Sequence, residues 1–214
     1  MVGKFKKLFA SDAPLQLFSI WCRRKNVSIK VYFQTLFARL YLFRWGVITG
    51  PGLSVSGKVQ CINEGSLRIG SNVRINSGPD RNFVGGNMRT LLKVAPRGKL
   101  EVGNGVGMSG VTIVTQNHIT IGNHTLLGGG CEIYDNDFHE LDPKERLEKS
   151  GNIKSYSVTI GNNVFIGAQS IILKGVTIGN CSIVGAGSVV AQNIPAYEVW
   201  AGNPACRIKS IASS

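Results

Sequence analysis

Residues 160–190 read IGNNVFIGAQSIILKGVTIGNCSIVGAGSVV, and one aliphatic residue recurs in this stretch at every sixth position. The recurring residues are Ile160, Ile166, Ile172, Ile178, Val184 and Val190. An α-helix repeats near every 3.6 residues and a single strand every two residues. A sustained period of six therefore predicts a stack of hexapeptide repeats.

The other positions of each hexapeptide predict how the chain turns. Glycine follows the aliphatic residue four times, and the fourth position after it is small or β-branched at Val164, Ser170, Val176, Ser182 and Ser188. We expect Gly, Asn162, Asn163 and Asn180 at corners, where φ turns positive. Three such sides make one triangular turn of a parallel β-helix, whose backbone hydrogen bonds run to the turns above and below.

The same period recurs upstream in shorter runs. Ile121, Leu127 and Ile133 keep step, and a one-residue slip separates them from a second run, Val102, Met108 and Val114; Ile69 and Ile75 form a weaker pair. The intervals from Ile75 to Val102 and from Ile133 to Ile160 are not multiples of six. Two loops are therefore predicted to leave the coil. The predicted organisation is an N-terminal segment, residues 1–50, followed by a β-helix domain, residues 51–214, with a loop excursion at 134–157.

The composition allows one domain with an appendage. The chain has 214 residues, 43% of them apolar, and its 27 glycines show no three-residue period. Five cysteines without a C-x-x-C pair indicate reduced packing residues. The chain lacks a long apolar stretch and the features of a signal peptide, so we expect a cytoplasmic protein.

The positive charge is concentrated in residues 1–50, which carry nine Lys or Arg and one Asp, a net charge of 9 − 1 = +8 out of +12. This segment is also rich in aromatic residues. Two interpretations remain open: residues 1–45 contact an anionic membrane, or they cap the open end of the coil and pack against a neighbouring subunit. No nucleic-acid recognition module accompanies the charge, so nucleic acid is not an expected partner.

His139 is the strongest candidate for chemistry. It lies in the second loop with Asp135, Asp137, Glu140 and Asp142 around it. An imidazole titrates near neutral pH, and a nearby carboxylate can orient its ring, as a general base requires. A solvated loop histidine without a task is the alternative. No metal site is predicted, because no second histidine converges on this loop.

Four motifs together carry a family resemblance: Ile160-Gly-Asn-Asn-Val-Phe-Ile-Gly-Ala, Gly175-Val-Thr-Ile-Gly-Asn, Val184-Gly-Ala-Gly-Ser-Val-Val and Ala201-Gly-Asn-Pro-Ala. With the His139 loop in the same order, the chain resembles the left-handed β-helix O-acetyltransferases, the group of the galactoside and maltose acetyltransferases. The segment from Tyr134 to Asp142 is most similar to the polysaccharide-biosynthesis branch. The resemblance spans roughly residues 65–211.

The resemblance implies an all-β, left-handed parallel β-helix with an N-terminal helical or irregular segment, a protruding loop and a short C-terminal helix. It also implies a homotrimer with active sites in clefts between coils, and acetyl-CoA as the donor. In this family pattern His139 is the general base and the Ala168 amide stabilises the oxyanion. Asp137 is our choice for the carboxylate that orients His139, with Asp135, Glu140 and Asp142 as the alternatives. The resemblance further places Phe165, Ala168, Gly185 and Ala186 at the cofactor. The basic residues Lys174, Arg207 and Lys209 are candidates for its phosphates, Arg207 before the others. Ser109 stands where the galactoside enzymes have an Asn that holds the acceptor, and with Asp135 it is the candidate for acceptor binding.

The expected function is therefore acetyl-CoA-dependent O-acetylation of a sugar or glycan hydroxyl in cell-surface polysaccharide biosynthesis, on a lipid-linked acceptor at the inner face of the membrane. Two alternatives remain. The same scaffold serves N-acetylation of an amino-sugar nucleotide or acetylation of serine, and a β-helix can also bind partners without catalysis. For Lys174, Arg207 and Lys209, ordinary surface charge is the alternative to cofactor binding.

Overall fold

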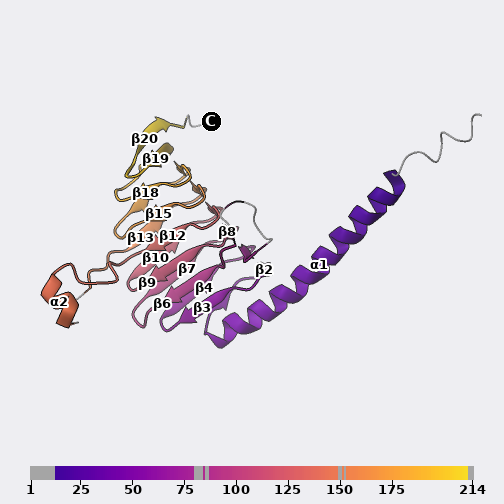
Figure 1. Cartoon of the computed structure of the whole chain (residues 1–214), viewed down its shortest axis with the longest axis horizontal. Coiled ribbons are helices and arrows are strands. Elements are labelled where there is room, and N and C mark those ends of the chain that lie inside the picture. The colour runs from indigo at the N-terminus through magenta and orange to yellow at the C-terminus, as the bar shows by residue number, and fades with distance from the viewer. Residues whose placement is uncertain (1–12, 80–83, 85–86, 149–150, 152, 212–214) are drawn as a thin grey trace, which may run out of the picture.

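The structure is a computed structural model that describes residues 13–79, 84, 87–148, 151 and 153–211, with side chains from residue 29 onward. Three sheets, whose strands are parallel except for the last strand of the chain, form the walls of a column (Figure 1). Sheet A contains β1 (Ile48–Thr49), β4 (Ser66–Ile69), β7 (Lys99–Val102), β10 (His118–Ile121), β13 (Val158–Ile160) and β16 (Thr177–Ile178).

Sheet B contains β2 (Ser54–Gly57), β5 (Arg74–Ser77), β8 (Gly107–Ser109), β11 (Leu126–Leu127), β14 (Phe165–Ile166), β17 (Ile183–Val184), β19 (Glu198–Gly202) and β20 (Ala205–Ser210). Sheet C contains β3 (Gln60–Asn63), β6 (Leu91–Val94), β9 (Thr112–Thr115), β12 (Glu132–Tyr134), β15 (Ile171–Ile172) and β18 (Val189–Val190). The chain visits the sheets in the order A, B, C, so the column has three edges, which we call A–B, B–C and C–A.

The register confirms that three hexapeptides make one turn. Ile160 pairs with Ile178 and Ile166 with Val184, in each case one turn apart. Every aliphatic residue of the sixfold series is buried in the core, with at most 1% of its surface exposed. Burial of one aliphatic side chain per wall supplies the main driving force for the coil. The predicted left-handed parallel β-helix is confirmed.

The glycines at the corners are required for a different physical reason from the positive φ that the sequence predicts. Gly161, Gly167 and Gly179 are absent from the positive-φ residues, and a Cβ on each would lie 2.5, 2.4 and 2.3 Å from atoms of the next turn. Close approach of stacked turns therefore excludes a side chain there. Positive φ occurs two residues later, at Asn163 (+56°) and Cys181 (+59°).

Asparagines form a ladder along the A–B edge. Asn123 N–H donates to Asn162 Oδ1 and Asn162 N–H donates to Asn180 Oδ1, both at 2.7 Å. Asn162 and Asn180 thus belong to corners, as predicted, but they act by accepting backbone hydrogen bonds across turns. This satisfies amides that the strands leave unpaired.

The small-residue positions are buried as predicted. Their serines also satisfy corner carbonyls: Ser170 Oγ donates to Gly167 O at 2.9 Å, Ser182 Oγ to Pro195 O at 2.7 Å and Ser188 Oγ to Gly185 O at 2.6 Å. A hydroxyl is favoured there because a buried carbonyl without a donor is costly.

Two upstream predictions need correction. Ile113 points into the core and Val114 does not, because Ile113 stacks under Ile133 in the ladder between β9 and β12. The interval from the inward-facing Met108 to the inward-facing Ile113 is five residues instead of six, so the period shifts at this wall. The first excursion is also shorter than the interval from Ile75 to Val102, because β6 returns to sheet C at Leu91.

Helix α1 (Ala13–Arg44) caps the first turn of the coil with its C-terminal part. Thr35 Oγ1 accepts a hydrogen bond from Val55 N–H at 2.9 Å, Tyr41 Oη accepts one from Cys61 N–H at 3.2 Å, and Arg39 donates to Gly50 O at 2.8 Å. These bonds satisfy an edge that would otherwise be open. Capping of the coil is confirmed for the C-terminal part of α1, whereas packing of this segment against a neighbouring subunit stays a prediction. The rest of α1 projects away from the column (Figure 1).

The C-terminal end of the column differs from the prediction. The short helix expected at the C-terminus is wrong, since β19 pairs in parallel with β17 and β20 folds back antiparallel on β19. Trp200 in β19 is 9% exposed and closes the core. A strand is favoured here because the last turn of sheet B presents unpaired backbone groups.

Cysteine packing and the helices complete the fold. Cys61 and Cys131 are buried, as the packing interpretation predicted, and burial raises the pKa of the Cys61 thiol to about 12. The interpretation is wrong for Cys206, which is exposed, and Cys181 is only half-buried. Across the described residues, no helix has both the length and the apolar character that spanning a membrane requires.

Candidate active site

The second excursion leaves the column at the C–A edge, after β12, and returns before β13. It contains helix α2 (Pro143–Glu148) and projects on the side of the column opposite α1 (Figure 1). Its base is closed by an antiparallel bridge between Asn136 and Ser155 and by the bond from Tyr156 N–H to Asp135 O at 2.8 Å. The loop predicted at 134–157 therefore has an anchored base.

Asp135 holds this base from inside. Its carboxylate is fully buried and accepts hydrogen bonds from Gln116 N–H at 2.8 Å, from Asn117 N–H at 2.9 Å and from the hydroxyl of Thr115. Both oxygens are used by the preceding turn. The geometry gives Asp135 a structural role and offers no support for the predicted contact with an acceptor.

Asp137 and Lys174 form an ion pair at the same edge. Their side chains are 19% and 27% exposed, so the pair is partly shielded from water. Asp137 was expected to orient His139 and Lys174 to meet the phosphates of the cofactor. The geometry joins the two residues to each other instead, and the second carboxylate oxygen of Asp137 is buried without a partner among the described residues.

His139 is exposed on the outer part of the loop. Its backbone N–H donates to Asp137 O at 2.7 Å, after a turn in which Phe138 has φ +61° and donates to Asn136 Oδ1 at 2.9 Å. Within the described residues the imidazole makes no hydrogen bond. A hollow of about 580 Å³ adjoins it, lined by Phe138, His139, Glu140, Glu145, Arg146, Gly151 and Ile153.

Glu145 and Arg146 were not identified from the sequence. They lie in α2, which Asp142 caps by accepting hydrogen bonds from Lys144 N–H at 2.8 Å and Glu145 N–H at 3.1 Å. The signal that predicts this helix is the run Asp142-Pro-Lys-Glu, an N-cap residue followed by proline and an acid in the first turn. Across the described residues, no group of three His, Cys, Asp or Glu side chains has the geometry to hold a metal ion.

The B–C edge presents backbone donors. In successive turns the coil uses Gly167 N–H, which donates to Val184 O, and Gly185 N–H, which donates to Trp200 O, both at 2.8 Å. The next residues, Ala168 and Ala186, donate no backbone hydrogen bond within the described part of the chain. Ala168 therefore has the free N–H that an oxyanion donor needs. The amide of Gly185, predicted to face the cofactor, is engaged in the coil.

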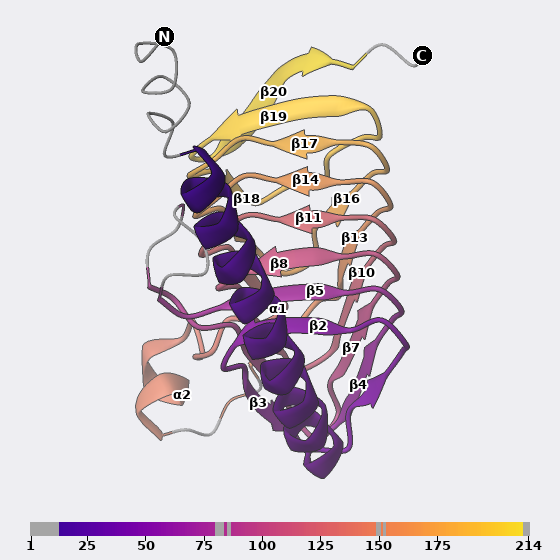
Figure 2. The ribbon, with the colours of Figure 1, turned by 90° about the vertical axis from the view of Figure 1, so that its right-hand side faces the viewer.

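The remaining cofactor candidates lie on sheet B, whose strands face the viewer in Figure 2. Phe165 in β14 is 46% exposed, and Arg207 and Lys209 lie on β20. Arg207 donates to Glu198 Oε1 at 2.7 Å. The hydrogen bond from Trp200, and then that from Arg207, lowers the pKa of the Glu198 carboxyl. Ser109 in β8 accepts from Asn76 Nδ2 at 3.2 Å on the same sheet.

The predicted residues thus form two groups on one chain. His139, Asp135, Asp137 and Lys174 lie at the C–A edge, and the others lie on sheet B or at the B–C edge. A single chain does not place the imidazole of His139 on the edge that carries the Ala168 N–H.

Comparisons with known proteins agree with this architecture. Residues 157–192 match the family model of the bacterial transferase hexapeptide (six repeats). The protein CapG of Staphylococcus aureus is 46% identical over 93 residues, which cover 44% of this chain and 53% of CapG. Galactoside O-acetyltransferase of Escherichia coli (strain K12) is 40% identical over 100 residues, 46% of each chain. The chain spans about half the length of the curated relatives it matches.

Among solved structures, AntD, an N-acyltransferase from Bacillus cereus in complex with dTDP-4-amino-4,6-dideoxyglucose and coenzyme A, has a TM-score of 0.62. It is 23% identical and the alignment covers 82% of this chain and 89% of AntD. At this identity the likeness concerns the fold. Repeat and fold together confirm the resemblance to the hexapeptide acetyltransferases that the sequence motifs predicted.

Proposed function

We propose that this chain is an acetyl-CoA-dependent O-acetyltransferase that acts on a sugar hydroxyl. The observation that carries the proposal is the free backbone N–H of Ala168 at a corner where the coil uses the neighbouring amide. A fixed donor of this kind stabilises the oxyanion that forms during acyl transfer, and its removal typically costs about 10²–10³-fold in rate.

In the proposed reaction, a ring nitrogen of His139 removes the proton from the acceptor hydroxyl. The hydroxyl oxygen attacks the thioester carbonyl, the Ala168 N–H holds the developing oxyanion, and the carbon–sulfur bond then breaks. The imidazolium returns the proton to the departing thiolate, so the products are an acetyl ester and a free thiol. General base catalysis of this kind contributes about 10²–10⁴-fold.

The donor is acetyl-CoA, bound along sheet B. Phe165 offers an exposed aromatic surface next to Ala168, the free N–H of Ala186 lies one turn further, and Arg207 and Lys209 lie on the last strand, where they meet the phosphates. Two comparisons support this donor: the name of galactoside O-acetyltransferase and the coenzyme A bound to AntD.

The complete site forms between chains of a homotrimer. Because His139 and Ala168 belong to different edges of one column, the His139 loop of one subunit faces the B–C edge of the next. A cyclic trimer repeats this heterologous contact three times and closes on itself. The proposed setting is cytoplasmic biosynthesis of cell-surface polysaccharide, with a lipid-linked glycan as the acceptor.

N-acetylation of an amino sugar is the second candidate, favoured by the structural likeness to AntD. The same assay distinguishes the two, because O-acetylation yields an ester that alkaline hydroxylamine cleaves and N-acetylation yields a resistant amide.

The test measures transfer from labelled acetyl-CoA to a panel of sugars and amino sugars. His139→Ala is expected to lower kcat by about 10²–10⁴-fold. The melting temperature should not change, since the imidazole is exposed and makes no hydrogen bond to the described residues. His124→Asn, at an A–B corner with φ +57°, is the matched control and keeps full activity. Full kcat in His139→Ala would remove the proposed base.

A coil without catalysis is tested separately by thermal unfolding with acetyl-CoA. A ligand present at 100 times its Kd stabilises the folded state by about 2.7 kcal/mol. No stabilisation at saturating concentrations would favour a non-catalytic scaffold over the enzyme.

A further inference from the structure

Helix α1 exposes a row of large apolar side chains on the side that faces away from the column. We call this row the outer face of α1; it consists of Ile29, Phe33, Leu36, Leu40 and Phe43, which are 56, 52, 44, 57 and 78% exposed. The residues follow each other at intervals of four and three, so they line one side of the helix. The buried Ala38 and Leu42 lie on the opposite side, against the coil. A contiguous apolar surface of this kind marks an interaction site.

The helix that carries this face has only positively charged residues among its charged residues. Between residues 13 and 44 the sequence contains six basic residues and no Asp or Glu: Arg23, Arg24, Lys25, Lys30, Arg39 and Arg44. Lys30 and Arg44 are exposed beside the outer face and form no ion pair with the described residues. Their charge is therefore available to an anionic partner.

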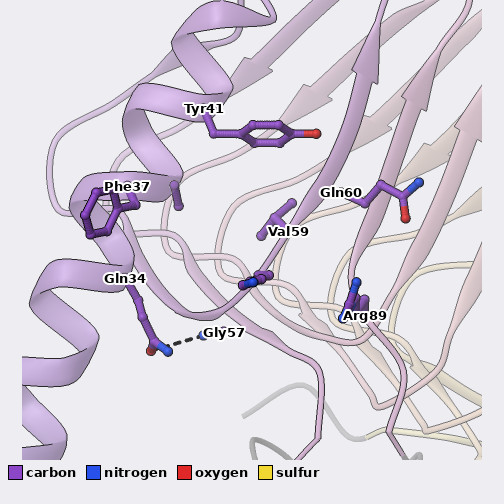
Figure 3. Close-up of a pocket in the computed structure, with 9 residues that line it drawn as sticks. Gln34, Phe37, Tyr41, Gly57, Val59, Gln60 and Arg89 are labelled. Carbon is purple, nitrogen blue, oxygen red and sulfur yellow. Dashed lines mark hydrogen bonds between the residues drawn. The ribbon is translucent and has the colours of Figure 1, made fainter.

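A groove next to the outer face adds two more cations. It encloses about 610 Å³ between α1 and the first turn of the coil, and its lining includes Phe37, Tyr41, Val59, Lys58 and Arg89 (Figure 3). Phe37 and Tyr41 come from the helix, whereas Val59 and Arg89 lie across from it. Lys58 and Arg89 form no ion pair within the described part of the chain. An apolar wall beside two unpaired cations matches a phosphate that is attached to a hydrocarbon chain.

A second copy of α1 fits this face poorly. Two identical helices would bring twelve positive charges together without an acid to offset them. The four-and-three spacing also fails toward the N-terminus, where it reaches Asn26, Cys22 and Ser19, so no apolar seam continues for a coiled coil.

We propose that the outer face of α1 lies in the headgroup region of an anionic lipid bilayer, with a lipid phosphate in the groove between Lys58 and Arg89. Aromatic and aliphatic side chains enter the boundary of the acyl chains, while the basic residues reach the phosphates. Three consecutive cations, Arg23 to Lys25, suit the interface and would be costly in the hydrocarbon core. The proposal is independent of acetyl transfer.

The test is flotation of the full chain with phosphatidylcholine vesicles, with and without phosphatidylglycerol. The chain is expected to float with the anionic vesicles, and Phe33→Glu with Leu40→Glu is expected to lower the partition coefficient at least about tenfold. The matched control is Leu141→Glu with Leu147→Glu, which should leave binding unchanged. These two apolar residues are 69 and 84% exposed, and they lie just before α2 and within it. Helix α2 projects on the side of the column opposite α1 (Figure 1).

The role of the groove is tested with variants in which an uncharged glutamine replaces a positively charged residue. Lys58→Gln with Arg89→Gln should weaken binding to anionic vesicles about fivefold for each cation removed. Arg68→Gln with Lys93→Gln removes the same charge from exposed positions on sheets A and C and should change binding at most about twofold.

Three outcomes would overturn the proposal. These are equal recovery with neutral and anionic vesicles, undiminished flotation of the Phe33 and Leu40 double variant, and equal effects of the two pairs of charge variants. A smaller oligomer for the Phe33 and Leu40 double variant in sedimentation, with flotation retained, would assign the face to a second copy.

Discussion

The B–C and C–A edges of the same column are built in different ways. In its last turns the B–C edge repeats: a glycine amide bonds to the next turn, a buried serine satisfies the corner carbonyls, and the following residue, Ala168 or Ala186, donates no backbone hydrogen bond to the described residues. In its first turns the same edge carries the first excursion, between β5 and β6. At the C–A edge the repeat is interrupted between Tyr134 and Val158, and contacts that involve side chains replace the ladder.

This difference separates two kinds of chemical group. A regular coil is rigid and supplies fixed backbone donors, but every wall of a hexapeptide is committed to packing and pairing. A titratable group that must approach a substrate needs a segment that leaves the coil. In the proposed reaction, the donor Ala168 and the base His139 lie on different edges of one chain, so a neighbouring subunit of the proposed trimer would bring them together.

The largest effect is expected from trimers that mix two inactive chains. Ala168→Pro removes the free N–H and no hydrogen bond of the coil, and should lower kcat about 10²–10³-fold. His139→Ala should lower it about 10²–10⁴-fold. Co-assembly of equal amounts restores about one quarter of the sites, because one interface in four pairs an intact His139 with an intact Ala168.

Activity of the mixed trimers is measured after unfolding and refolding the two chains together. As the control, the separately refolded chains are combined only in the assay and should stay inactive. If co-refolded chains stay as inactive as the separate ones, both groups act within one chain and the two edges do not cooperate.

A smaller effect is expected at the C–A edge from the pair Asp137 and Lys174. Lys174→Met leaves a partly buried carboxylate without its partner and should lower the free energy of unfolding by about 1–3 kcal/mol. A double-mutant cycle with Asp137→Asn measures the coupling by urea unfolding, expected at about 0.5–3 kcal/mol.

The exposed pair of Lys99 and Glu101 provides the comparison for this cycle. Its side chains are 45 and 35% exposed, so Lys99→Met should cost only about 0–1 kcal/mol. If Lys174→Met and Lys99→Met lower the free energy of unfolding equally, partial burial adds nothing to the ion pair of Asp137 with Lys174.

The smallest effect concerns pH and the last strands of sheet B. Hydrogen bonds from Trp200 and Arg207 lower the pKa of the Glu198 carboxyl in the folded chain. The stability that Glu198 contributes is therefore present above its unfolded pKa of about 4.3 and is lost as pH falls through the lower folded value. The melting temperature of Glu198→Gln should lie below that of the wild type near neutral pH. The difference between the two melting temperatures should vanish at acidic pH. A constant gap across this range would contradict the assignment.

The sequence predicted the walls of the column better than its corners and ends. Aliphatic residues every six positions gave the inward side chains of the last turns correctly, because each wall buries one residue by the same local rule. The prediction failed at Val114, where one wall is a residue shorter. It also failed at residues 205–210, where the unpaired edge of β19 recruits a strand in place of a helix.

The candidate site residues stay predictions, and the structure changes the contacts expected of several of them. His139 and the cofactor candidates on sheet B follow from motif and order along the chain. The ion pair of Asp137 with Lys174 joins residues 37 positions apart, and the burial of Asp135 depends on amides of the preceding turn. Neither contact leaves a pattern in a single sequence.

Composition and period alone were enough to establish a hexapeptide coil with a loop that carries His139, since both depend on local burial and spacing. The register between turns decides which backbone amides stay free and which carboxylate is satisfied by hydrogen bonds. It also decides that His139 and Ala168 lie on different edges. Register is a property of stacked chain segments far apart in sequence, so it appears only when the coil is closed.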